Sequence, residues 1–241
     1  MKHTLTLVRK SDDDAIFRDN GATGGKVHLE KISWFMPHVL PSDMERMQLY
    51  KTIESKTAIS IAFRARQCDT ITAAQSRSFS WELGSHTSSE KPRYVIVAFQ
   101  TEKDGDQEKN SSIFDHCDLK NMYVKLNKTR YPAVDYDLSF PNQQFSRAYR
   151  DAATFSEKFY GMDELITQSN ITPADFKALY PIMVFDVSKQ SEKLKSSVVD
   201  IKIKATFNTA IPAGTQCYAV VISDKLLKVQ SDGQKMLVVT K

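Results

Sequence analysis

The stretch VVDIKIKATF, from Val198 to Phe207, alternates strictly between apolar and polar side chains after its first residue. Apolar side chains occupy positions 199, 201, 203, 205 and 207, and Asp200, Lys202 and Lys204 lie between them. A period of two with one apolar face is typical of a half-buried antiparallel strand. The stretch therefore predicts a sheet that turns one face to a core and the other to water.

Shorter runs elsewhere repeat this alternation and predict further strands. They are HTLTLV (3–8), AISIAF (58–63), SFSWEL (78–83) and MYVKL (122–126). The runs YVIVAF (94–99) and PIMVFDV (181–187) are more uniformly apolar and predict central strands. Near the C-terminus KLLKVQ and KMLVVT enclose SDG, which predicts a hairpin with Gly233 at a positive φ. About nine or ten strands are expected from such runs.

One region departs from the strand pattern. From Gln143 to Met162 apolar side chains recur at helical spacing, and Gly161 is suited to end the helix. A second helix is predicted to begin at TPAD, with Thr172 as the N-cap, and to run to about Leu179. We therefore expect one β-sandwich domain over residues 1–241 with a helical insertion at 143–179.

The bulk composition is that of a soluble globular protein. Hydrophobic residues make up 41% and charged residues 26% of the 241 positions. The net charge is +4, and the basic residues are interspersed with acidic ones, so the charge does not by itself indicate binding to nucleic acid. No signal-peptide or membrane-spanning run is present, and the odd number of cysteines disfavours a disulfide framework. We expect an intracellular protein that is not secreted, in which the glycosylation-type triplets at Asn110, Asn127 and Asn170 stay unmodified.

The segment FDHCDL (114–119) gathers two carboxylates, an imidazole and a thiol. A zinc site needs three or four converging ligands, whereas His116 and Cys117 are adjacent and would point to opposite faces of a strand. We expect Asp115 or Asp118 to fix a turn, His116 to form a hydrogen bond at the strand start, and Cys117 to be buried. A Cys–His nucleophilic pair assembled in space remains the enzyme alternative.

The other candidate motifs are weaker. GATGGKV (21–27) has three residues between its outer glycines where a P-loop needs four, and it is expected to precede a strand. The carboxylates of SDDDAIFRD (11–19) lack the spacing of a calcium loop. No stacking aromatic alternates with the basic residues Lys193, Lys195, Lys202 and Lys204, so no specific nucleic-acid site is predicted. The sequence thus predicts no catalytic, cofactor-binding or metal-binding residue.

Several longer phrases carry a family resemblance. They are KHTLTLVRKSDDDAIFR (2–18), ISWFMPHVLPSD (32–43), EKPRYVIVAFQT (90–101), NSSIFDHCDLKNMYVKLN (110–127), YPAVDYDLSFPNQQFSRAYRDAATFSEKFYG (131–161) and LYPIMVFDVSKQSEKLKSSVVDIKI (179–203). Together they resemble the double jelly-roll major capsid proteins of adintovirus- and Polinton-type elements and their genome-integrated capsid-like relatives. The resemblance covers nearly the whole chain.

This resemblance implies a mainly β, antiparallel jelly-roll sandwich without catalysis or cofactors. Such capsid proteins carry two rolls in tandem, and this chain resembles the C-terminal roll alone. The implied partners are other copies, most simply in a trimer, other capsid subunits, or a missing N-terminal jelly roll. The implied location is the virion or the inside of the host cell.

The competing interpretation is a carbohydrate- or protein-binding jelly-roll module domesticated from a mobile element. Trp34 and Trp81 are its candidate stacking residues, although we expect both in the core.

Overall fold

The computed structural model describes residues 4–86, 90–161, 171–191 and 198–239. The strands are β1 (Ile59–Thr72), β2 (Ser78–His86), β3 (Glu90–Thr101), β4 (Leu119–Leu126), β5 (Thr129–Tyr131), β6 (Met183–Asp186), β7 (Val199–Phe207), β8 (Thr215–Ser231) and β9 (Met236–Val238). The helices are α1 (Asp12–Ala15), α2 (Asp43–Glu54), α3 (Ser146–Ala153), α4 (Phe155–Tyr160) and α5 (Pro173–Ala178).

The strands form two antiparallel sheets. One sheet has the order β1-β8-β3-β6, with β9 beside β8, and the other has the order β2-β7-β4-β5. The chain alternates between the sheets from β1 to β4 and again from β6 to β8, so that sequence neighbours face each other across the layers. This strand order is that of a jelly roll, which confirms the predicted antiparallel sandwich.

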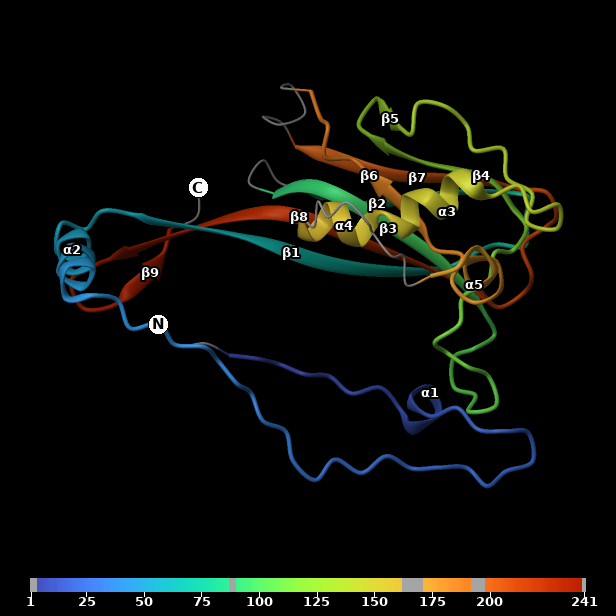
Figure 1. Cartoon of the computed structure of the whole chain (residues 1–241), viewed down its shortest axis with the longest axis horizontal. Coiled ribbons are helices and arrows are strands. Elements are labelled where there is room, and N and C mark those ends of the chain that lie inside the picture. The colour runs from blue at the N-terminus through green and yellow to red at the C-terminus, as the bar shows by residue number, and fades with distance from the viewer. Residues whose placement is uncertain (1–3, 87–89, 162–170, 192–197, 240–241) are drawn as a thin grey trace.

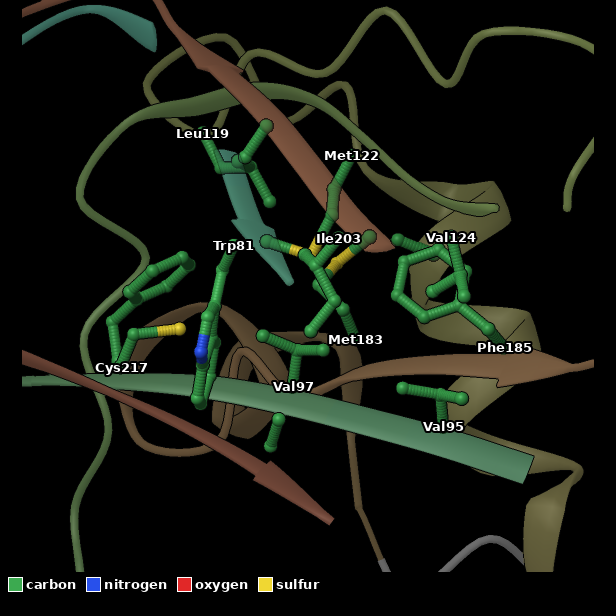
Figure 2. Close-up of a cluster of buried hydrophobic side chains, with 14 of the residues drawn as sticks. Trp81, Val95, Val97, Leu119, Met122, Val124, Met183, Phe185, Ile203 and Cys217 are labelled. Carbon is green, nitrogen blue, oxygen red and sulfur yellow. The ribbon is translucent and has the colours of Figure 1, made fainter. Parts of the chain in front are cut away.

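The core lies between the inner faces of the two sheets. The apolar positions of β7 are all buried and its alternate positions are not, as the opening pattern predicts. β4 and β8 show the same alternation through most of their length, and Trp81 of β2 is buried with them. Figure 2 shows these side chains meeting between the layers. Each large apolar side chain buried in this way contributes roughly 1.5–3 kcal/mol to folding.

The helical insertion follows the prediction with one break. Instead of one helix to Met162, α3 and α4 are separated at Thr154, whose hydroxyl donates to the carbonyl oxygen of Arg150 at 2.9 Å. Gly161 ends α4 in the left-handed conformation (φ 66°), and Thr172 caps α5 in a capping box with Asp175. Met162 and the remainder of 162–170 lie outside the described residues.

The helix α4 covers part of the outer face of the first sheet (Figure 1). Phe155 and Phe159 contact the ring of Tyr94 edge-on, with centroids 5.1 and 6.0 Å away. Arg64 of β1 donates to the carbonyl oxygen of Phe159 at 2.7 Å, and its guanidinium lies 4.7 Å from that ring. A second, smaller apolar cluster therefore holds the insertion on the sandwich.

Three strand predictions are wrong in part. Residues 4–8 of HTLTLV are not in a strand, and His3 lies outside the described residues. PIMVFDV supplies β6, which within the described structure pairs only with β3 and is an edge strand. Its side chains are apolar because they are buried on both faces of the sheet, not because strands lie on both sides. In AISIAF, Ile61 and Phe63 remain 43% and 46% exposed although β1 forms as expected.

The segment before β1 lies outside the sandwich. Residues 4–42, named here the N-terminal arm, lie outside both sheets, are extended apart from the short helix α1, and lead into α2 (Figure 1). α2 was not expected, because no apolar stripe marks it; it forms behind a capping box between Ser42 and Glu45, and none of its residues is buried. The arm and α2 contribute nothing to the sandwich core.

Candidate functional site

The FDHCDL segment is a turn that leads into β4 at Leu119. Cys117 and Asp118 both have positive φ (47° and 49°), and the N–H of Leu119 donates to the carbonyl oxygen of His116 at 2.9 Å. This turn overrides the expectation that His116 and Cys117 point to opposite faces. Both line one open pocket of about 480 Å³, together with Lys177 of α5.

The carboxylates of this turn are bound by protein groups. Asp115 accepts from the backbone N–H of Thr101 at 2.8 Å and from Nζ of Lys103 at 3.0 Å. Asp118 accepts from the amide of Asn208 at 3.2 Å. Both therefore tie the turn to neighbouring segments, which confirms their predicted structural role.

The imidazole and the thiol are not arranged as a nucleophile and its base. Nδ1 of His116 accepts from the N–H of Asp118 at 2.9 Å, and its ring stacks on Phe140 with centroids 4.5 Å apart. Burial lowers the pKa of His116, against the opposing effect of the Asp118 carboxylate. Burial raises the pKa of the Cys117 thiol to about 11, and its sulfur lies 4.0 Å from the hydroxyl of Thr101. Because the thiolate is the reactive form, this thiol is poorly nucleophilic at neutral pH.

The backbone N–H groups of Gly25 and Val27 in the glycine-rich loop donate hydrogen bonds to side chains of the same chain. The N–H of Gly25 donates to Oε1 of Gln107 at 2.9 Å, and the N–H of Val27 donates to a carboxylate oxygen of Asp12 at 3.3 Å. Asp14 in turn accepts from the N–H of Gly105 at 2.7 Å, which lowers the pKa of its carboxyl. The loop and α1 thus fasten the arm to the β3–β4 loop. Within the described ranges, no three His, Cys, Asp or Glu side chains gather as metal ligands.

The basic residues lie on the outer face of the second sheet. Lys202 pairs with Glu82, and the strand register places Lys125 opposite Lys202 and Arg130 opposite Lys125. Tyr123 of β4 lies opposite Lys204, with the guanidinium of Arg130 3.9 Å from its ring. No aromatic residue alternates with these lysines along β7, as expected, and Tyr123 comes to the same face from the neighbouring strand β4. Lys193 and Lys195 lie outside the described residues.

The two tryptophans lie in different environments. Trp81 is in the core, as expected, whereas Trp34 is 53% exposed, so its predicted burial is wrong. Trp34 belongs to a set of exposed apolar side chains along the arm. They are Leu5, Leu7, Val8, Phe17, Leu29, Ile32, Trp34, Phe35, Met36, Val39 and Leu40. Sequence reasoning missed this surface, although ISWFMPHVL (32–40) is apolar without a complete strand or helix period.

The fold defines the chain as a jelly-roll protein. It belongs to the family described as the double jelly roll-like domain, whose model matches residues 1–227. This bears out the family resemblance at that level, while the adintovirus or Polinton type stays a prediction.

Among solved structures, a chain from the cryo-EM structure of the Sputnik virophage is similar, with 10% sequence identity and a TM-score of 0.40. The match covers 76% of this chain and 39% of that one, so the chain spans about two fifths of its length. No curated protein matches the sequence. In the part of the chain that is described, no helix is both long and apolar enough to cross a membrane.

Proposed function

We propose that this protein is a structural, self-associating building block of a viral or virus-derived shell and that it performs no catalysis. The observation that carries the proposal is the contrast between a jelly roll with a complete core and an arm whose apolar side chains face solvent. Exposed apolar surface on this scale is typical of protein–protein contacts. Family membership supports the same role, because double jelly-roll proteins resembling this chain are capsid proteins.

The state of the FDHCDL turn argues against the enzyme alternative. The Cys117 thiol has a raised pKa, and His116 uses Nδ1 to accept a backbone hydrogen bond and stacks its ring on Phe140. Each group is therefore engaged in holding the turn. Slow reaction of Cys117 with a maleimide in the folded protein, together with a metal analysis that finds none, is the expected result; a fast, pH-independent reaction would favour the enzyme.

The assembly we propose is a trimer, with other capsid subunits or a separate N-terminal jelly roll as further partners. A heterologous contact repeated around an axis closes into such a ring. Adintovirus- or Polinton-type parentage and a location in the virion or the host-cell interior belong to the same proposal. So does the organisation of residues 1–241 as a single domain.

A carbohydrate-binding module is the second candidate, and the exposure of Trp34 is the observation that favours it. An exposed indole can stack on a sugar ring. The neighbouring Phe35 is 89% exposed as well, so the surface around Trp34 is largely apolar. Such a surface is better suited to contact with a protein than to binding a sugar, which also needs polar groups. Saturable binding on a glycan array that is lost in Trp34→Ala would favour this candidate.

The decisive experiment is sedimentation velocity of the purified chain over a wide concentration range, with electron microscopy of the same samples. We expect concentration-dependent oligomers with the trimer as the main species. A strictly monomeric protein at the highest concentration would contradict the proposal. A bovine serum albumin standard run at the same concentrations controls for non-ideality.

A further inference from the structure

The second half of the arm has no partner in the described chain. The first half is fastened by Arg18, whose N–H donates to the carbonyl oxygen of Gln107 at 2.8 Å, and by the loop at Gly25. From residue 28 to residue 41 no hydrogen bond, ion pair or ring contact joins the arm to any described residue. Yet Ile32, Trp34 and Met36 alternate along it as in a strand.

The strand β1 offers a free edge. It is 14 residues long and pairs only with β8, so one side of its backbone has no strand beside it in the described structure. Its first half projects beyond the second sheet toward α2 (Figure 1), which leaves Ile61 and Phe63 partly exposed. A long, partly apolar edge strand is a ready template for pairing with another chain.

The other free edges are less suited to an apolar strand. β2 places Ser78, Ser80 and Glu82 on its outer face, and its inner side chains already fill the core. β6 has only four residues and β5 only three. β1 is therefore the edge that matches an extended apolar segment in both length and chemistry.

We propose that residues 28–36 of one copy add as an extra strand to the free edge of β1 in a second copy. Ile32, Trp34 and Met36 would then cover Ile61 and Phe63. Pro37 lacks a backbone N–H and marks the end of the added strand. This inference rests on the proposed function, because it names the surface through which the building block associates.

The structure favours a second copy over the arm's own sheet. The arm is fastened at one end of the sandwich and continues into α2 at the other, and between these points it arches away from β1 (Figure 1). Each copy would give one arm and receive one, so the contact is heterologous and can close into a ring. Trp34, which is 53% exposed, would remove roughly 100 Å² from water, and Ile32 and Met36 on the same face would add to it, toward the ~800 Å² per partner of a stable interface.

Cross-linking between two marked chains tests the contact. One chain carries Ser33→Cys and Cys68→Ser, and a longer, tagged chain carries Ser60→Cys and Cys68→Ser. The two are mixed and treated with a short bis-maleimide. We expect a mixed product, with much less when Ser80→Cys on the β2 edge replaces Ser60→Cys as the matched control. Buried Cys217 and half-buried Cys117 have raised thiol pKa values and should react slowly.

Substitutions in the arm provide the second test. Ile32→Ser with Trp34→Ser should weaken association by about tenfold or more in sedimentation equilibrium, whereas Val39→Ser, beyond Pro37 and 87% exposed, should change it by less than about threefold. Unchanged circular dichroism verifies folding. Assembly of the native chain that neither variant alters, or a mixed product no greater than with the Ser80→Cys control, would overturn this inference and leave the proposed function standing. A native chain that never assembles would overturn both.

Discussion

The sandwich and the N-terminal arm use the same kinds of side chain with opposite results. Ile201 and Ile203 of β7 are 1% and 0% exposed, whereas Phe35 and Leu40 of the arm are 89% and 95% exposed. Local patterning does not explain the difference, because both segments contain alternating apolar positions. The difference lies in the second layer: β7 faces another sheet, and the arm faces none in the described part of the chain. Whether an apolar side chain is buried thus depends on the surface that faces it as much as on the strand that carries it.

The largest expected effect is a cavity at the centre of the sandwich. Phe99 of β3 is fully buried and contacts the rings of Phe79 and Phe207 edge-on. Phe99→Ala should lower the free energy of unfolding by about 3–5 kcal/mol, because it removes a large transfer contribution and leaves a cavity. Urea unfolding monitored by circular dichroism measures it. The matched control is Phe35→Ala in the arm; an equal loss there would break the contrast between the two regions.

A smaller loss is expected where the insertion meets the first sheet. Phe159 packs on Tyr94 and receives the guanidiniums of Arg64 and Arg66 at 4.7 and 5.7 Å from its ring. Phe159→Ala should cost about 3 kcal/mol, the low end for a buried phenylalanine, because this cluster is one-sided. Tyr160→Ala, an exposed neighbour, serves as the control. A loss below about 0.5 kcal/mol in Phe159→Ala would mean that α4 is not held on the sheet.

The turn at the rim of the sandwich should add a pH dependence. Burial holds the pKa of His116 below its ordinary value, so the folded protein favours the neutral ring. The stability from this group is then full above the unfolded pKa and is lost as the pH falls through the folded one. His116→Gln should flatten the acid side of the stability curve below about pH 6.5, the ordinary pKa of an imidazole. Urea midpoints at several pH values measure it, and an unchanged slope would contradict it.

Strand periodicity predicted the sandwich because every second side chain of a strand faces the opposite sheet. This period of two can be read directly from the sequence. The alternation at 199–207 and the capping box at Thr172 both depend on residues close in the chain, and both were found as expected. The left-handed pair at Cys117 and Asp118 could not be foreseen, because neither is glycine. A turn before the strand was expected at FDHCDL, but these two backbone conformations were not, and His116 and Cys117 were therefore expected to point to opposite faces.

The candidate surfaces were harder to foresee than the fold. The contact between Tyr123 and the basic row depends on the register of β4 with β7 and β5, which no local pattern encodes. Trp34 was expected in the core because large aromatic residues usually lie there. Its exposure depends on where the arm runs relative to the sheets, and nothing within residues 28–41 specifies that path.

The smallest expected effect is on the stability of the arm variants themselves. Leu40→Ser replaces a side chain that is 95% exposed and has no described contact partner, so the free energy of unfolding of the monomer should change by less than about 0.5 kcal/mol. The measurement is urea unfolding at a dilution where the protein is monomeric, with Ile203→Ser as the buried counterpart. Loss of stability in Leu40→Ser would show that the arm packs on its own sandwich. The contrast between the two regions would then reflect an open conformation of the arm and not a surface kept for a second chain.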